Sequence, residues 1–230
     1  MSQSAPSPAR PAEAAPGLDR PAAARARILD AALAEFAEHG FSGARVDAIA
    51  ARAAINKRML YAYVGNKEAL WLAVLERVYA AMREGERALN LQRLPPEEAM
   101  RVLVRYNARF HAEHPAFLAL LNDENRQRAR NLRRSTRVQP MYSPLLATIA
   151  DLLRRGEAEG LFRGKVDPMQ LYISIAGLSY FYCSNQHTLS AIFGRDLGAP
   201  GEMLVREQHV VDVVLGYLRP ASALDRVPEV

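Results

Sequence analysis

The chain has 230 residues, of which half are hydrophobic and 24% are charged, and its 30 Lys and Arg against 25 Asp and Glu give a net charge of +5. These fractions are typical of globular proteins, and they exclude a largely disordered chain. The single cysteine, Cys183, excludes a disulfide scaffold and fits a reducing compartment, so we expect a cytoplasmic protein. The length allows one or two domains with a sizeable core.

Both ends of the chain predict tails. Residues 1–21 are rich in proline, alanine and serine and show no apolar periodicity, which is typical of disorder. The apolar run of a secretory signal is absent from this stretch, so we expect no cleaved leader. Residues 221–230 are expected to form a short C-terminal tail.

Everything between the tails predicts helices. Apolar residues recur at helical spacing from Ile28 to Phe36, with Glu35 expected on the polar face, and Gly40 follows as a stop. Two short helices come next, and Asn66 is an N-cap for a fourth that runs to about Leu89. Further helices are expected at 95–114, 115–130, 144–159, from 168 onwards and at 202–218. No stretch alternates with period two for long enough to predict a strand, so the fold class is all-α with about nine helices.

Residues 168–194 carry no charged side chain, which raises the question of a membrane span. The strongly apolar part, 171–183, is shorter than the roughly twenty apolar residues that a span needs. An apolar helix of this length is usually buried in a core or in a subunit interface. We therefore expect no membrane contact.

The two short helices, 46–53 and 57–63, have the dimensions of a helix-turn-helix. Small and apolar residues at 53–55 allow the helices to approach closely, and Asn56 is a good N-cap for the second helix. In this motif the second helix enters the major groove and presents its N-terminal residues to base edges.

Positive charge is concentrated on this motif. Residues 43–67 contain one acid, Asp47, and five cations, a net charge of +4 that nearly matches that of the whole chain. The cations are Arg45, Arg52, Lys57, Arg58 and Lys67. Such clustering is the electrostatic footprint of a surface that faces phosphates.

From residue 27 to residue 70 the sequence resembles the N-terminal domain of TetR-type transcriptional regulators. The resemblance lies in residues 28–32, 46–50, 60–63 and 66–70, together with Phe36, Gly40, Phe41 and Lys57. Three positions depart from the family: Ala54 stands where Gly is usual in the turn, Val64 where Phe is usual, and Arg45 where a hydroxyl residue caps the second helix. The resemblance implies a helix-turn-helix DNA-binding domain over 22–66 and a helical effector-binding and dimerisation domain over 67–220.

Downstream, residues 94–98, 167–174 and 187–197 resemble the branch of the family whose C-terminal domain is shared with the pyrimidine-utilisation regulator. This resemblance implies a homodimer joined through helices near 168–193 and 202–218. It also implies an effector pocket inside each C-terminal domain, for a pyrimidine-like or other small planar molecule.

The residues expected to contact DNA are Arg45, Asn56, Lys57, Arg58, Met59, Tyr61, Tyr63 and Lys67. We expect Asn56 to cap its helix and Lys57 and Arg58 to contact bases or phosphates, with Met59 as an apolar neighbour. The two tyrosines can each donate a hydroxyl to the DNA backbone. Arg45 can reach a phosphate, and Lys67 lies at a helix start whose dipole also favours an anion.

The C-terminal domain is rich in aromatic residues, and effector pockets in helical domains have mainly apolar walls with a few polar groups. The residues expected to line a pocket are Tyr106, Phe110, Phe117, Asn122 and Tyr172. His111 and His114 have a spacing that can chelate a metal, but no third ligand is evident, so neither a metal nor another cofactor is expected. Six arginines in 126–137 predict either a second nucleic-acid patch or a solvated helix end.

Taken together, the sequence predicts a homodimeric repressor that binds a palindromic double-stranded operator and is released by a small molecule. Two alternatives remain: an α-helical enzyme and a non-specific DNA-binding protein. The first lacks a Gly-rich phosphate loop and a His-Glu-x-x-His motif. Competition with bulk DNA at physiological salt separates the second from a specific repressor, because binding to a specific site should survive it.

Overall fold

The computed structural model describes residues 20–220, so the predicted tails over 1–21 and 221–230 lie outside it apart from Arg20 and Pro21. The described part is all-helical and contains no strand. It has ten α-helices and two short 3-10 helices: α1 (Arg20–Gly43), α2 (Val46–Arg52), α3 (Lys57–Val64), α4 (Lys67–Ala88), η1 (Leu91–Arg93), α5 (Pro96–Glu113), α6 (Pro115–Arg126), η2 (Leu132–Arg134), α7 (Val138–Ala158), α8 (Pro168–Ser184), α9 (Gln186–Phe193) and α10 (Pro200–Leu218).

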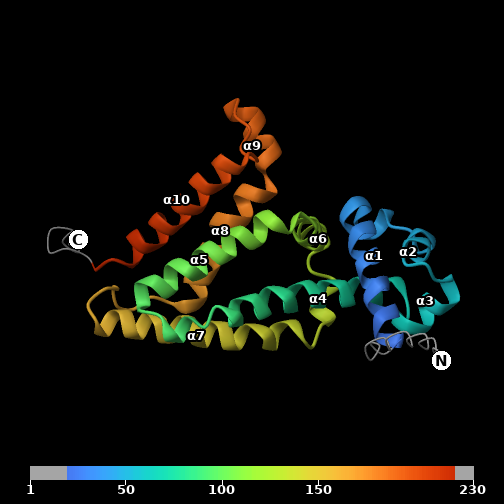
Figure 1. The fold of residues 1–230 in the computed structure, drawn as a ribbon, viewed down its shortest axis with the longest axis horizontal. Coiled ribbons are helices and arrows are strands. Elements are labelled where there is room, and N and C mark those ends of the chain that lie inside the picture. The colour runs from blue at the N-terminus through green and yellow to red at the C-terminus, as the bar shows by residue number, and fades with distance from the viewer. Residues whose placement is uncertain (1–19, 221–230) are drawn as a thin grey trace, which may run out of the picture.

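Helices α1, α2 and α3 pack around the start of α4 and form a small unit at one end of the molecule (Figure 1). Its core is centred on the fully buried rings of Phe36 and Trp71, which meet edge to face with their centroids 4.9 Å apart. Gly40 has a φ of 66° and interrupts α1, as the sequence predicts, because this left-handed conformation favours glycine. The chain can therefore turn towards α2.

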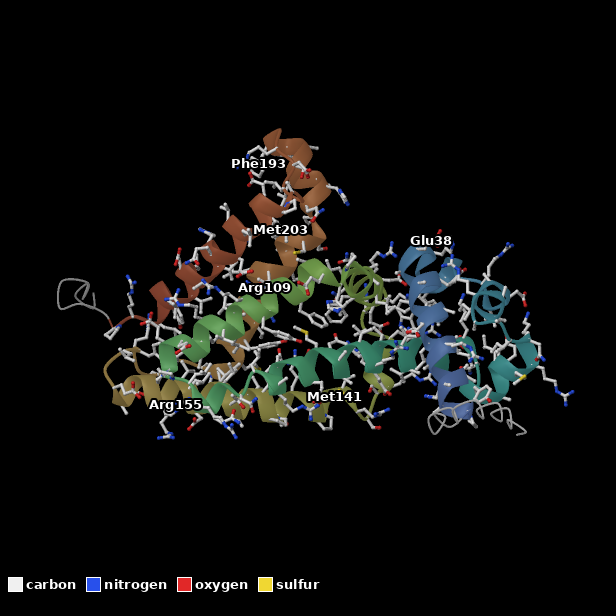
Figure 2. All side chains as sticks on the ribbon, in the orientation of Figure 1. Glu38, Arg109, Met141, Arg155, Phe193 and Met203 are labelled. Atoms are coloured by element: carbon white, nitrogen blue, oxygen red, sulfur yellow. The ribbon has the colours of Figure 1, made fainter. Side chains whose placement is uncertain are left out.

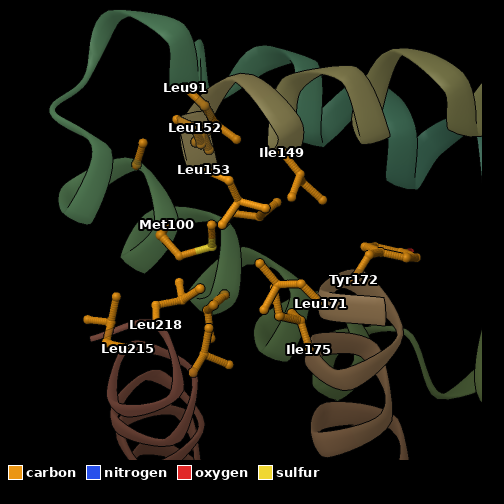
Figure 3. Close-up of a cluster of buried hydrophobic side chains, with 14 of the residues drawn as sticks. Leu91, Met100, Ile149, Leu152, Leu153, Leu171, Tyr172, Ile175, Leu215 and Leu218 are labelled. Atoms are coloured by element: carbon orange, nitrogen blue, oxygen red, sulfur yellow. The ribbon is translucent and has the colours of Figure 1, made fainter. Parts of the chain in front are cut away.

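The second unit is built from the rest of α4 together with α5, α7, α8 and α10. Figure 1 shows α4 and α7 lying side by side, with α8 and α10 converging on α9 at the far end of an arm. The core between these helices is aliphatic, with Met100, Ile149 and Ile175 fully buried (Figure 3). Tyr172 lies at the edge of this cluster, where the packing becomes aromatic.

Three helix boundaries differ from the sequence-based expectation. Helix α7 begins at Val138 rather than Pro144, because the Ser135 hydroxyl accepts hydrogen bonds from the backbone N–H groups of Arg137 and Val138 and so starts the helix earlier. The stretch from 168 to 193 is two helices that meet at Asn185, which makes ten helices rather than nine. Helix α6 ends at Arg126, four residues early, since two residues that follow it adopt positive φ angles.

None of the helices in residues 20–220 combines the length and the apolar character needed to cross a bilayer. Helix α8 is buried on one face, through Leu171, Tyr172 and Ile175, and exposes apolar side chains on the other. Burial in the core, one of the two expected alternatives, is therefore confirmed for one face only, and a subunit interface on the other face stays a prediction.

Candidate nucleic-acid interface and ligand cavity

Local capping fixes the geometry of the α2–α3 motif. The Asn56 side chain accepts a hydrogen bond from the backbone N–H of Met59 over 2.8 Å, so it caps α3 as predicted. Asn66 caps α4 in the same way, by accepting from Ala69. In the turn between α2 and α3, Ala54 has a φ of 52°, the left-handed conformation for which glycine is the usual residue.

Strain at this turn leads to a prediction about stability. Replacing Ala54 by glycine relieves the left-handed strain, and we expect it to stabilise the protein by up to about 1 kcal/mol. The matched control is Ala62→Gly in the middle of α3, where the same substitution should destabilise by about 1 kcal/mol because glycine is a poor helix former. Urea denaturation of both variants measures these changes. Destabilisation by Ala54→Gly would contradict the conformation of the turn.

The cap of α2 comes from a residue that the sequence did not single out. Glu35 was predicted to lie on the polar face of its helix, and this was wrong, because its side chain is only 2% exposed. Its carboxylate accepts a hydrogen bond from the backbone N–H of Arg45 over 3.0 Å and lies 3.5 Å from Nε of Arg52. The Arg45 side chain itself makes no capping bond and is left exposed at the surface.

The first turn of α3 is fully displayed to solvent. Asn56, Lys57, Arg58 and Met59 are all exposed. Lys57 forms an ion pair with Asp47 of α2, with Nζ 2.9 Å from Oδ1, and this hydrogen bond and charge raise the pKa of the lysine. Within the described residues, the Arg58 side chain has neither a hydrogen bond nor an ion pair, so it is available to an external partner.

The remaining predicted contact residues differ in accessibility. Tyr61 is exposed, whereas Tyr63 is half-buried against the core of the small unit. Lys67 donates to the carbonyl oxygen of Ala44 over 2.6 Å, and its Nζ lies 5.1 Å from the centre of the Phe41 ring. This lysine therefore already ties the end of α1 to the start of α4.

A chain of aromatic rings lines the interior of the second unit. Successive ring centroids lie 5.3 to 6.2 Å apart, a range typical of favourable edge-to-face and tilted pairs. The rings in order are Tyr106, Phe110, Phe117, Tyr79, Tyr142 and Tyr172. Four of the five predicted pocket residues are therefore brought together. Asn122 lies apart on the surface of α6, where it bonds to Ser184 and Tyr180 of α8.

Charged residues that the sequence analysis missed complete this site. Arg83 is 3% exposed, and its Nη2 donates to the Tyr172 hydroxyl over 2.8 Å and lies 3.0 Å from Glu86. The guanidinium also covers the Tyr142 ring at 4.5 Å. The spacing on α4 could have indicated that Glu86 is buried, because it continues the series of buried residues Leu75 and Met82 at helical intervals.

Beside these charges lies a cavity of about 730 Å³ between α4, η1 and α7. Arg83 and Glu86 contribute to it from α4, and Met141, labelled in Figure 2, and Leu145 from α7. We refer to this cavity and the ring chain together as the chamber. Its size lies within the range of ordinary small-molecule sites.

Two carboxylates of α6 link the two units. Asp123 accepts a hydrogen bond from the backbone N–H of Phe41, next to the Gly40 kink, over 2.6 Å. Glu124 is buried and accepts from the Trp71 indole N–H over 2.8 Å and from the backbone N–H groups of Asn131 and Leu132 over 2.7 Å each. Phe117, a member of the ring chain, lies on the same helix. Helix α6 is therefore hydrogen-bonded to both α1 and α4.

The other candidate features are accounted for locally. His111 and His114 each direct Nδ1 to a backbone carbonyl of α5. In the arginine-rich run over 126–137, the two terminal arginines pair with Asp123 and Glu76. The four arginines between them are exposed.

Comparison with known proteins identifies the family. The profile of the bacterial regulatory proteins of the tetR family matches residues 28–74, and the tetracyclin repressor-like C-terminal domain matches residues 96–214. The chain belongs to the TetR family of DNA-binding transcriptional regulators. The matched TetR-family relatives are regulators of transcription rather than enzymes.

Individual relatives support this assignment over most of the chain. The transcriptional repressor NicS of Pseudomonas putida is 37% identical over 173 residues, which cover 75% of this chain and 82% of NicS. The regulator RutR of Escherichia coli is 45% identical, but over only 51 residues, or 22% of this chain and 24% of RutR. In structure, the transcriptional regulator SCO4942 of Streptomyces coelicolor is similar with a TM-score of 0.63 and 26% identity, over 85% of this chain and 98% of its own.

Proposed function

We propose that the protein is a cytoplasmic repressor that binds a palindromic operator as a homodimer and leaves it when a small molecule occupies the chamber. It acts by binding and not by catalysis. The observation that carries the proposal is the exposed first turn of α3, with Arg58 free of partners within residues 20–220, on a chain of the TetR family. A helix presented in this way fits the major groove.

In this proposal the residues of the motif divide into two roles. Arg58 and Met59 reach base edges. The DNA backbone is contacted by Lys57, Arg45 and Tyr61, and to a lesser extent by Tyr63, which is half-buried. Asn56 and Lys67 hold helix ends in place, since both already bond to the protein, and Asn56 can also touch a phosphate. Lys57 must exchange Asp47 for phosphate when it binds.

The dimer is supported by an apolar face on α8 and α10. Ile173, Phe181 and Tyr217 are each at least half exposed, which is costly for side chains of this size in a monomer. On α8, Gly177 lies one turn from both Ile173 and Phe181, and nothing lies within 4 Å of the position that a Cβ would take there. A small residue in the middle of such a face lets a second helix approach closely, and a symmetric dimer matches the twofold symmetry of a palindrome.

The effector step is supported by the position of α6 between the chamber and the small unit. A ligand that displaces Phe117 also shifts the two carboxylates that hold Phe41 and Trp71. The spacing of the two α3 helices in the dimer then changes, and DNA affinity falls by as much as the ligand prefers the released conformation. The aromatic chamber favours a small planar effector, and a pyrimidine-like molecule is one candidate.

Lys57→Ala tests the proposed phosphate contact. We expect weaker operator binding and a slope of log affinity against log salt that is smaller by about one, because one fewer counterion is released. Fluorescence anisotropy over a salt series measures both. Asp47→Asn is the matched control: it removes the competing partner of Lys57 and should strengthen binding. An unchanged salt slope in Lys57→Ala would rule out the contact.

Footprinting of the full chain on DNA upstream of its own gene tests the function as a whole. We expect protection of a palindromic site that survives an excess of bulk DNA at physiological salt. Protection without a defined site would instead support the non-specific binder.

A further inference from the structure

We infer that the chamber binds a small aromatic carboxylic acid, whose carboxylate pairs with Arg83 and whose ring lies in the cavity against Met141, Pro144 and Leu145. The inference deepens the proposed function, because it names the chemical class of the effector. Binding of the acid can still be tested without any DNA.

The first step is the state of Arg83. Its Nε and Nη1 are buried and have no hydrogen-bond partner within the described residues, although the side chain is almost fully enclosed. An arginine stays protonated in proteins, so these two N–H groups remain donors that need acceptors. Buried donors without acceptors cost free energy, and an anionic ligand is the partner that satisfies them best.

The second step is that Glu86, 3.0 Å from Arg83, neutralises it only in part. Burial raises the pKa of Glu86 to about 7, against the attraction of Arg83, so the carboxyl is partly protonated near neutral pH. Neither of its oxygens makes a hydrogen bond. Burial also lowers the pKa of His111 and raises the pKa of Tyr79 to about 12, so both are neutral. The chamber therefore holds a positive charge that is only partly compensated.

The third step concerns the shape of the ligand. The guanidinium of Arg83 already covers the rings of Tyr142 and Tyr172, at 4.5 and 5.3 Å. A ligand therefore meets the charge from the side of the cavity, where Met141, Pro144 and Leu145 form a mainly apolar wall. A planar ring bearing one carboxylate matches this arrangement, whereas a polyphosphate would need more than one buried cation.

The geometry also provides a way in. The cavity between α4 and α7 leads to Arg83 and Glu86, and its lining includes two further arginines, Arg87 and Arg137, against one further carboxylate, Asp151. Both are more than half exposed. Positive charge at an entrance raises the local concentration of anions and guides them inwards.

The test compares benzoate with benzamide, which has nearly the same shape but no charge. Calorimetric titration of the full-length protein should show benzoate binding about tenfold more tightly, because charge-assisted hydrogen bonds are stronger than neutral ones. Equal binding of benzoate and benzamide, or no binding of benzoate, would overturn the inference.

Variants locate the site. Arg83→Met should abolish the preference for the acid, and Arg83→Lys, which keeps the charge, should retain part of it. The double variant Arg83→Met with Glu86→Gln leaves no buried charge and serves if the single variant fails to fold. Arg109→Met is the matched control, because Arg109, labelled in Figure 2, pairs with Glu207 beside a different cavity. Acid binding that survives in Arg83→Met would contradict the assignment.

Operator release is measured separately. Benzoate that binds through Arg83 without displacing DNA would support the chemistry of the chamber and overturn the release step of the proposed function. Release by benzoate that is lost in Arg83→Met would support both.

Discussion

Phe181→Arg will separate the proposed dimer and weaken operator binding by at least about a hundredfold. Phe181 is 57% exposed in the single chain and lies on the apolar face of α8 with Ile173. In a twofold interface the substitution places two arginines in an apolar contact, where an unpaired charge is strongly unfavourable. A monomer reads one half-site and loses the gain in effective concentration that linked binding provides, which is typically 10² to 10⁴.

Sedimentation velocity measures the assembly, and fluorescence anisotropy measures DNA affinity. The control is Leu161→Arg, which adds the same charge at an apolar residue with 39% exposure outside α8 and α10. That variant should remain dimeric and bind DNA as the wild type does. A dimeric Phe181→Arg protein would show that the apolar face has another purpose.

Glu124→Leu will lower the free energy of unfolding by about 3 to 5 kcal/mol, the largest loss of stability that we expect from a single site. The carboxylate is buried and accepts hydrogen bonds from the Trp71 indole and from the backbone of Asn131 and Leu132. Leucine leaves these donors unpaired inside the protein, and each hydrogen bond to a charged group contributes about 1.5 to 3 kcal/mol. The contributions of the three hydrogen bonds are not fully additive, so the expected loss is smaller than their sum.

Urea denaturation, followed by the fluorescence of Trp71, measures this loss. Glu124→Gln is the control, because its amide keeps one acceptor and nearly the same shape, and it should lose clearly less stability. The single tryptophan reports on the small unit, while circular dichroism reports on all helices, so the two probes together test whether the units unfold as one. A loss below about 1 kcal/mol for Glu124→Leu would contradict the link through α6.

Features set by neighbours in the chain could be predicted from the sequence. Asn56 and Asn66 cap the helices that follow them, and Gly40 interrupts its helix, because each acts on backbone within a few residues. Four of the residues expected in the pocket also lie together in the ring chain, although none of them lines the cavity itself. The charge cluster of the motif was visible because exposed residues need no tertiary partner to be recognised.

Features that depend on distant partners could not be predicted in this way. The early start of α7 depends on Ser135, which is held by Glu76 of α4. Glu35 was expected on the polar face and Arg83 was not singled out, because charged side chains are usually exposed, yet tertiary contacts bury both. Asn122 has the polarity of a pocket residue, but the position of α6 directs it to Ser184 instead.

Selection of bound sequences from random duplex DNA, with the full chain at physiological salt, tests the central claim most directly. A homodimer that reads DNA through α3 should enrich one palindrome with two half-sites about one helical turn apart or more. An aromatic acid that occupies the chamber should then release that same sequence. Enrichment of an asymmetric site, or of no sequence at all, would contradict the account.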